Sequence, residues 1–395
     1  MTEKMLKFVD INQENPSKRD KIERKVDFDE IYGEFINEKA SQQSSRCSQC
    51  GVPFCQVHCP LSNNIPDWLK LTAEGRLEDA YELSQSTNNM PEVCGRICPQ
   101  DRLCEGNCVI EQSGHGTVTI GSIEKYITEA AWDKGWVKPI EVVEELNQSI
   151  GIIGAGPAGL ACGEELRKKG YQITIYDRYD RAGGLLIYGI PNFKLEKHVV
   201  NRRIKLLEDG GIKFILNFEV GKNLTLNQLK EKHDAILIAT GVYKPREVNI
   251  PGNDLNNIFP AMDFLTASNR KGLGDKVESL LVDKIKLGEP DESGRRIPLI
   301  QKNSEFEIKA DLIIKALGFD PEELPKLFDE EKLQVTKWGT IKTDFDTMET
   351  NIPGVFAAGD IIRGASLVVW AIKDGRDVAK SIDKYLNSIQ SKKVA

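Results

Sequence analysis

The sequence lacks several features that would assign it to other classes of protein. No stretch reaches the 18 or more uninterrupted apolar residues of a membrane span, and the first ten residues lack the apolar core of a signal peptide. Basic residues form no block, since 53 Lys and Arg stand against 60 Asp and Glu for a net charge of −7. These absences predict a soluble cytoplasmic protein with neither a membrane partner nor a nucleic-acid partner.

Histidine is also scarce, with four residues in 395, but cysteine is not. Eight of the nine cysteines lie between residues 47 and 108, in two groups. The first group reads Cys-x2-Cys-x4-Cys-x3-Cys-Pro from Cys47, and the second reads Cys-x3-Cys-x5-Cys-x3-Cys from Cys94. Cys162 stands apart and is most simply a small core residue.

Three uses of the two cysteine groups compete. Disulfides would need an oxidising compartment, which the N-terminal residues do not predict. Zinc sites usually contain paired CxxC knuckles or mix in histidine, whereas this chain has one CxxC, and His58 is better explained as a neighbour than as a ligand. A Cys-x2-Cys run ending in Cys-x3-Cys-Pro is typical of ferredoxins, which favours two [4Fe–4S] clusters over zinc. The candidate ligands are Cys47, Cys50, Cys55, Cys59, Cys94, Cys98, Cys104 and Cys108.

A dinucleotide-binding fingerprint follows the cysteines. A predicted buried strand at residues 149–153 runs into Gly154-x-Gly156-x-x-Gly159, then a helix and a second strand that ends at Asp177. Gly154 permits the tight turn, Gly156 lets the backbone approach a pyrophosphate, and Gly159 lets the helix pack closely. The helix N-terminus offers N–H groups to the anion, and Asp177 is placed to accept hydrogen bonds from a ribose.

Further glycine-rich turns favour FAD over NAD at this fingerprint. A buried strand from residue 234 ends at Thr240-Gly241, and another near residue 355 ends at Gly359-Asp360, before a helix that starts near Ser366. Asp360 would hold the ribityl or phosphate end of FAD, while the helix N-terminus would stabilise the reduced flavin. The candidate cofactor-binding residues are Gly154, Gly156, Pro157, Ala158, Gly159, Asp177, Arg178, Gly183, Gly184, Leu185, Gly189, Thr240, Gly241, Gly359, Asp360, Ser366, Leu367 and Val368.

Basic residues cluster on a predicted amphipathic helix that follows the glycine pair Gly183-Gly184. They are expected to form a solvated face, because a run of charges on a helix usually faces water. The residues are Lys194, Lys197, Arg202, Arg203 and Lys205.

Residues 47–68 and 93–108 closely resemble the small (beta) subunit of bacterial glutamate synthase and are similar to the equivalent half of dihydropyrimidine dehydrogenase. The likeness continues through residues 183–195 to Ala358-Gly-Asp360. It implies that NADPH reduces FAD and that electrons leave through two clusters to a large subunit, or another redox protein, in glutamate biosynthesis and ammonia assimilation. It also implies that the loop at residues 183–191 lies along the flavin. One cluster would be held by Cys47, Cys50, Cys55 and Cys108, and the other by Cys59, Cys98 and Cys104 with Cys94 as the candidate fourth ligand.

The chain departs from this family between Thr240 and Gly318. The family carries an NADPH-binding domain there, which needs on the order of 100 residues, whereas this interval holds about 75. Its one candidate turn, Gly272-Leu-Gly274, has no preceding strand and no third glycine, and a β-hairpin of residues 282–287 and 306–317 is expected instead. NADPH binding is therefore in doubt. The alternatives are an electron relay without a nicotinamide site and an inactive deletion form.

The predicted fold class is a helical domain holding two [4Fe–4S] clusters, followed by an α/β FAD-binding Rossmann-like domain that is split in sequence. The predicted divisions are an N-terminal arm (1–40), the iron–sulfur domain (41–145), the first FAD segment (146–268), a shortened remnant (269–317) and the second FAD segment (318–395). No side chain is predicted to act as a catalytic nucleophile or general base, because the cofactors would carry the chemistry.

Overall fold

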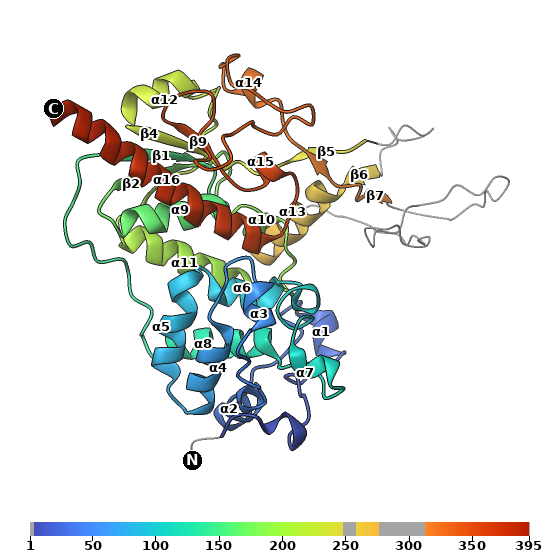
Figure 1. Ribbon diagram of the computed structural model, residues 1–395. Coiled ribbons are helices and arrows are strands. Elements are labelled where there is room, and N and C mark those ends of the chain that lie inside the picture. The colour runs from blue at the N-terminus through green and yellow to red at the C-terminus, as the bar shows by residue number, and fades with distance from the viewer. Residues whose placement is uncertain (1–3, 248–257, 276–312, 395) are drawn as a thin grey trace. The chain divides into compact units, whose positions relative to one another are not determined.

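The computed structural model describes residues 4–247, 258–275 and 313–394 (Figure 1). It divides into two compact units, one of Met1–Lys244 and Phe319–Ala395 and the other of Pro245–Gly318. The first unit contains a cysteine-rich helical part and then an α/β part. Among the described helices, none is both long enough and apolar enough to cross a bilayer, the 27-residue C-terminal helix included.

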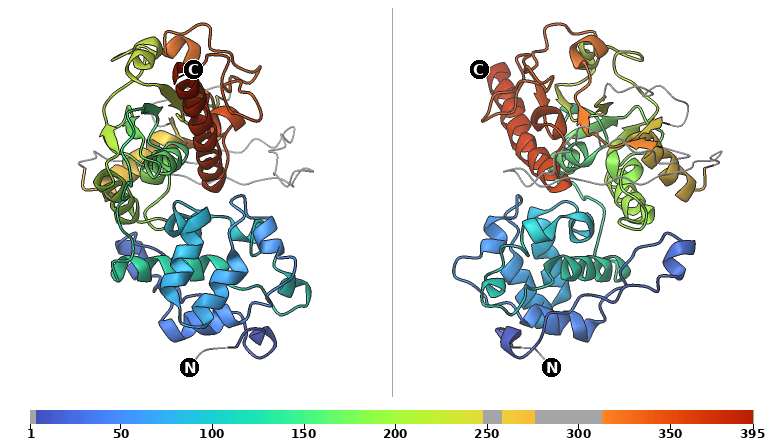
Figure 2. Two further views of the ribbon diagram at one scale, coloured as in Figure 1. Left: turned by 60° about the vertical axis from the view of Figure 1, so that its left-hand side comes forward. Right: turned by 90° about the vertical axis from the view of Figure 1, so that its right-hand side faces the viewer.

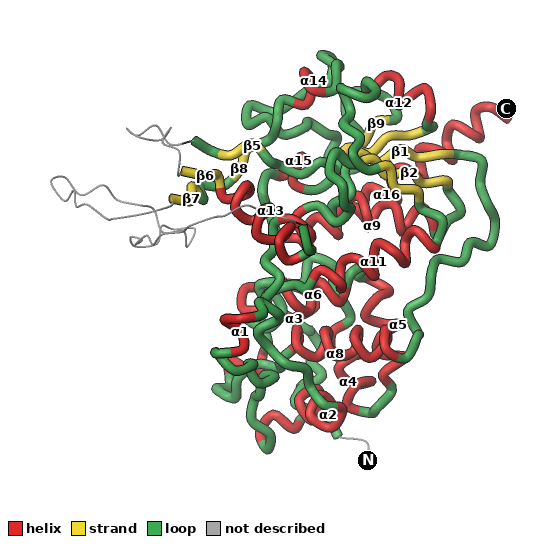
Figure 3. The backbone as a smooth tube through the Cα atoms, turned by 180° about the vertical axis from the view of Figure 1, so that it is seen from behind, coloured by secondary structure: helices red, strands yellow, loops and turns green. Residues whose placement is uncertain are grey.

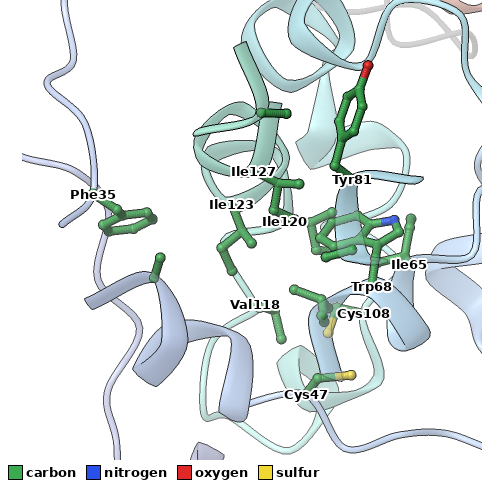
Figure 4. Close-up of a cluster of buried hydrophobic side chains, with 14 of the residues drawn as sticks. Phe35, Cys47, Ile65, Trp68, Tyr81, Cys108, Val118, Ile120, Ile123 and Ile127 are labelled. Carbon is green, nitrogen blue, oxygen red and sulfur yellow. The ribbon is translucent and has the colours of Figure 1, made fainter. Parts of the chain in front are cut away.

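The helical part is built on five longer helices. Proline in the first turn helps to start α4 and α6, where its missing N–H costs no hydrogen bond. Trp68, Ile123 and Ile127 are almost completely buried between these helices (Figure 4). The five are α2 (Asn37–Ser45), α4 (Ile65–Ala73), α5 (Leu77–Thr87), α6 (Pro91–Ile97) and α8 (Ile120–Asp133); the short ones are η1 (Lys7–Val9), α1 (Glu23–Val26), α3 (Phe54–Val57), η2 (Gln100–Arg102) and α7 (Val109–Gln112).

The α/β part is organised around a five-stranded parallel sheet with strand order β3-β2-β1-β4-β9. In the register of its centre, Ile152 lies between Ile175 and Leu237, and all three side chains are buried. Such apolar central strands are expected in a parallel sheet that helices cover on both faces. The strands are β1 (Ser149–Ile153), β2 (Gln172–Tyr176), β3 (Lys213–Ile215), β4 (Ala235–Ile238) and β9 (Val355–Ala357).

Helices cover the two faces of this sheet (Figure 3). α9 (Pro157–Arg167) lies on one face with the long α16 (Val368–Val394) packed along it, and α12 (Leu226–Lys232) lies on the other (Figure 2). A capping box between Thr225 and Gln228 starts α12. The remaining helices are α10 (Leu185–Tyr188), α11 (Lys197–Asp209), α14 (Leu324–Leu327) and α15 (Asp360–Arg363). This architecture confirms the predicted fold class.

The described residues of the second unit form a small βα arrangement. β6 (Ile258–Pro260) pairs in parallel with β7 (Ile313–Lys315), and α13 (Ala261–Gly272) follows β6 directly. The two-residue strands β5 (Lys244–Pro245) and β8 (Phe319–Asp320) lie where the chain leaves and re-enters the first unit. The predicted hairpin lies outside the described residues except for its last few positions.

The expected solvated face of basic residues is wrong for Lys197 and Arg203, whereas Lys194 and Lys205 are exposed as predicted. Lys197 and Arg203 are 5% and 4% exposed. The Arg203 guanidinium pairs with Glu92 of α6 through bonds of 2.7 and 2.9 Å, and Arg202 pairs with Glu129 of α8. α11 therefore packs against the cysteine-rich part, and carboxylates of that part compensate the charges of Arg202 and Arg203.

Candidate cofactor sites

The first glycine-rich turn connects β1 to α9 in a conformation that requires glycine. Gly154 has φ +112°, and a Cβ there would lie 2.3 Å from the Ala239 carbonyl oxygen. A Cβ on Gly159 would lie 2.1 Å from the Gly154 carbonyl oxygen, so α9 packs closely against the turn. Gly156 differs, because a Cβ there would meet nothing within 4 Å. Its missing side chain leaves room for a ligand.

That room belongs to a cavity of about 600 Å³ at the carboxyl ends of the strands, where open α/β sheets bind ligands. Ala239, Tyr243, Ala358 and Ala371 line it as well, and the sequence did not single them out. The predicted residues that line it are Gly154, Gly156, Pro157, Ala158, Asp177, Gly184, Leu185, Thr240, Gly241, Gly359, Asp360, Ser366, Leu367 and Val368.

Asp177 lies at the end of β2, and its side chain is held by the backbone. Its carboxylate accepts hydrogen bonds from the N–H groups of Ala155 (2.7 Å) and Tyr179 (2.9 Å). Burial raises the pKa of Asp177, and these two bonds oppose the rise. Each carboxylate oxygen keeps a free lone pair, so the group can still accept a bond from a ligand hydroxyl.

A second cavity of about 520 Å³ adjoins the first, and Gly154, Asp177, Thr240 and Tyr243 line both. Arg178 lies in its wall, with its guanidinium 2.9 Å from Glu322 and 5.1 Å from the centre of the Tyr243 ring. The two cavities form one elongated site, a shape that suits a dinucleotide. The sequence had predicted Arg178 here but had missed Tyr243, whose only signal was an aromatic residue two positions after Gly241.

Asp360 closes the other end of this site. It begins α15 after Gly359, whose φ of +81° requires glycine. Burial raises the pKa of Asp360 to about 6, and a hydrogen bond from the Ser366 backbone opposes the rise. The start of α16 contributes Val368 to the same cavity, together with the partial positive charge of a helix N-terminus.

Three other predicted glycines shape the site without lining these cavities. Gly159 allows the close packing of α9, and the Gly183 N–H donates to the Ala155 carbonyl at 2.9 Å, which ties the second glycine-rich loop to the first. Gly189 ends α10. The loop is also held by Lys197, whose Nζ donates to the carbonyls of Leu186 (3.0 Å) and Ile190.

All nine cysteines are free thiols, and the eight candidate ligands fall into two spatial groups. Burial raises the pKa of Cys55 to about 12, with further contributions from Cys47, Cys108 and Cys50. Cys47 and Cys108 come together at the edge of the helical core below Trp68 (Figure 4). The structure therefore brings together Cys47, Cys50, Cys55 and Cys108.

The second group surrounds a cavity of about 400 Å³ lined by Cys59, Cys94, Cys98 and Cys104. Burial raises the pKa of Cys59 to about 11 and raises that of Cys104 strongly. Buried thiols of this kind release their protons to a metal centre that supplies compensating positive charge, so the donor set fits an iron–sulfur cluster. The four thiols line the wall of a cavity. Among the described residues, no group of three or more His, Cys, Asp or Glu side chains is arranged to hold a single metal ion.

A fourth cavity, of about 750 Å³, lies between the second group of thiols and the elongated site, which is the flavin-type site. It is lined by Cys94 and Cys98 on one side and by Ile190 and residues 366–369 on the other. Val369 also lines the thiol cavity, while Ser366, Leu367 and Val368 line the elongated site. The start of α16 is thus the wall that these three cavities share.

Comparison with known proteins identifies the family of the chain. Residues 24–136 match the family described as dihydropyrimidine dehydrogenase domain II, 4Fe-4S cluster. Residues 148–282 and 274–375 match the family described as pyridine nucleotide-disulphide oxidoreductase. The glutamate synthase (NADPH) small chain of Azospirillum brasilense is 52% identical over 465 aligned positions, which cover 97% of this chain and 96% of that protein. The chain belongs to the glutamate synthase small-chain family.

Two relatives from Escherichia coli show the range of this family. The glutamate synthase (NADPH) small chain is 34% identical and covers 98% of this chain and 100% of its own length. The putative oxidoreductase AegA is 36% identical and covers 92% of this chain and 68% of its own length. As a member of the small-chain family, the present chain is an oxidoreductase of FAD and 4Fe–4S chemistry, as its sequence predicted.

The small-chain alignments also bear on the interval between Thr240 and Gly318, which the sequence analysis found to be short for this family. The alignment to the Azospirillum brasilense protein has 465 positions, so at least 70 of them have no counterpart in a chain of 395 residues. The match to the pyridine nucleotide-disulphide oxidoreductase family comes in two parts that meet at residues 274–282. This is the interval in which the sequence analysis had placed the missing core of the NADPH-binding domain.

Proposed function

We propose that this chain is the electron-relay subunit of a glutamate-synthase-type oxidoreductase. FAD would bind in the elongated site, one cluster would be held by Cys59, Cys94, Cys98 and Cys104, and the other by Cys47, Cys50, Cys55 and Cys108. FAD exchanges electron pairs, and the clusters carry single electrons onward. The observation that carries the proposal is the segment that leads into α16, because Ser366, Leu367 and Val368 line the elongated site and the next residue, Val369, lines the thiol cavity.

The residues of the elongated site have separate parts in holding FAD. Gly156 leaves space for the pyrophosphate, and the N-terminus of α9 presents N–H groups to it. Asp177 accepts a hydrogen bond from the ribose of the adenosine half. Asp360 and the N-terminus of α16 serve the ribityl and ring end. No described side chain is required to transfer a proton in this scheme.

Electrons would leave the chain through an uncharged surface near the Cys47 group. Residues 47–66 contain no Asp, Glu, Lys or Arg, although 29% of the chain is charged. In this segment Val52, Phe54 and Val57 are 62%, 47% and 63% exposed. Exposed apolar side chains without charge favour protein docking. The partner would be a glutamate-forming large subunit, since the relatives are named small chains.

The source of the electrons is the second part of the proposal. The relatives are named as NADPH proteins, but this chain has no second dinucleotide fingerprint, and at least 70 aligned positions are missing from it. These observations favour a relay that receives electrons from another reductant, such as a ferredoxin-like protein. NADPH oxidation by the remaining interval is the competing possibility.

An anaerobic titration of the purified, cofactor-loaded chain tests both parts. The visible absorption of flavin and clusters is followed during additions of NADPH and then of dithionite, with a full-length small chain as the control. Reduction by dithionite but not by NADPH supports the relay, whereas bleaching at near-stoichiometric NADPH shows a retained donor site. A chain purified without iron and flavin would contradict the proposal as a whole.

A further inference from the structure

Arg46 places a positive charge inside the helical part, directly before Cys47, and is 0% exposed. Its guanidinium donates hydrogen bonds to four backbone carbonyls, one in the N-terminal segment and three in the loop between α7 and α8. These are the carbonyls of Ile11 (2.9 Å), His115 (2.6 Å), Gly116 (3.2 Å) and Thr117. Among the residues that the structure describes, no carboxylate pairs with Arg46.

A buried cation without a buried anion is costly, so the retention of Arg46 needs an explanation. An arginine side chain keeps its proton in a protein, so the charge persists. The four carbonyls satisfy its donors but carry no net charge. Burial lowers the pKa of Arg46, and Cys108 opposes this effect. The missing negative charge is therefore to be sought among the neighbouring thiols Cys47, Cys50, Cys55 and Cys108, which we call the Cys47 group.

An iron–sulfur cluster at the Cys47 group would supply that negative charge. A cluster held by four thiolates is an anion, and it becomes more negative when it accepts an electron. A fixed positive charge acts strongly in poorly solvated surroundings, and it stabilises the reduced form more than the oxidised form. A role for Arg46 as a tie between chain segments would require only its hydrogen bonds and would not depend on its charge.

The second group of thiols has a charged neighbour of the opposite sign. Burial raises the pKa of Cys104, and Glu105 beside it raises this pKa further. The Glu105 carboxylate accepts a hydrogen bond from the Gly121 N–H at 3.0 Å. The two groups of thiols therefore lie in electrostatically different surroundings, and a change at Arg46 should affect one of them.

We propose that the charge of Arg46 raises the reduction potential of the cluster held by the Cys47 group. This inference rests on the proposed function, because it requires a cluster at these thiols. A higher potential makes this cluster the electron acceptor of the two. Electrons are thereby drawn toward the uncharged segment of residues 47–66, where we place their exit.

The test uses the full chain, purified anaerobically, with one variant that removes the charge and one that keeps it. Arg46→Gln is neutral but retains N–H donors, whereas Arg46→Lys stays positive. The control is Arg102→Gln, because Arg102 is exposed and lies two residues before Cys104. Iron and flavin contents are measured, and both centres are followed in a redox titration monitored by electron paramagnetic resonance. Cys50→Ser, which removes a candidate ligand of the Cys47 group, identifies the signal of that centre.

The Arg46→Gln chain should lower the potential of the Cys47-group centre by about 59 mV, which is ten-fold in the one-electron equilibrium, and leave the other centre unchanged. The Arg46→Lys chain and the control should match the wild type in both potentials. Loss of iron from this one centre in the Gln chain, with full iron in the Lys chain, would equally show that the charge is needed.

Two outcomes would overturn the inference. The first is an unchanged potential in the Arg46→Gln chain. The second is an equal effect of the Gln and Lys substitutions on potential, iron content or folding, because the hydrogen bonds would then matter and the charge would not. A wild-type chain without iron would instead refute the proposed function.

Discussion

The helical part and the α/β part of the first unit are built to hold their cofactors by opposite means. The helical part supplies side chains, and the thiols of Cys47 and Cys108 belong to the same buried cluster as Trp68 and Ile123. The α/β part instead leaves space for its cofactor by using residues without side chains, Gly154 and Gly156. The apolar core of its sheet is made of other residues. We therefore expect the fold of the helical part to depend on its metal and the α/β fold to form without its ligand.

Removal of iron should have the largest effect, and it should destabilise the helical part but not the α/β part. Buried thiols without a metal keep their protons, and structural metal centres contribute on the order of 10 kcal/mol to small domains. We expect α6 and α8 to lose their protection from hydrogen exchange after chelation, while β1, β2 and β4 keep theirs. The measurement is hydrogen exchange by mass spectrometry on the iron-loaded and iron-free chains. Equal protection in both samples would show that the helical core does not depend on its clusters.

A substitution at the contact between the two parts should have the next largest effect. Arg203→Met leaves Glu92, which is 0% exposed, as an unpaired buried charge. We expect a loss of about 3–5 kcal/mol in the free energy of unfolding, measured by urea denaturation. The double variant with Glu92→Met should recover much of this loss.

Lys205→Met is the matched control for this pair, because Lys205 lies on the same helix and its side chain is 66% exposed. Its effect should stay within about 0.5 kcal/mol. An Arg203→Met chain as stable as this control would show that α11 and α6 do not depend on their ion pair.

Addition of a side chain to the flavin-type site should affect binding and leave the fold intact. A methyl group at Gly156 meets no protein atom within 4 Å, so Gly156→Ala should keep its stability. It should weaken FAD binding about 10–100-fold, because overpacking against a ligand costs about 1–3 kcal/mol. The dissociation constant is measured by fluorescence when flavin-free protein is reconstituted. Gly154→Ala should instead lower stability, since its Cβ would strike the Ala239 carbonyl. Unchanged FAD affinity in the Gly156→Ala chain would place the pyrophosphate elsewhere.

The smallest expected effect concerns pH. Burial lowers the pKa of Lys197 to about 8, below its value in the unfolded chain. Between this pH and about 10.5 the unfolded chain binds more protons than the folded one, so stability should rise with pH across this range. Lys197→Met should remove this slope in urea denaturation, although it also breaks the bonds to Leu186 and Ile190. A slope that persists in the variant would assign the pH dependence to another group.

Local patterns allowed most of the fold and much of the candidate site to be predicted. The glycine turn at Gly154 and the cysteine spacings are encoded within a few residues, so the sequence alone indicates what they do. Burial of charge is not encoded in this way. Arg203 and Lys205 look alike on a helical wheel, but one pairs with Glu92 of another helix and the other faces water. Tyr243 was missed for the same reason, because its importance depends on what the fold brings next to it.

The order of strands in the sheet also has a consequence for biosynthesis. β4 ends at Ile238, but its neighbour β9 begins only at Val355, and α16 follows from Val368. The last candidate cluster ligand, Cys108, leaves the ribosome long before these segments do. We therefore expect the chain to acquire its metal during translation and its flavin only after release, so that a stalled or C-terminally truncated product would carry iron without FAD.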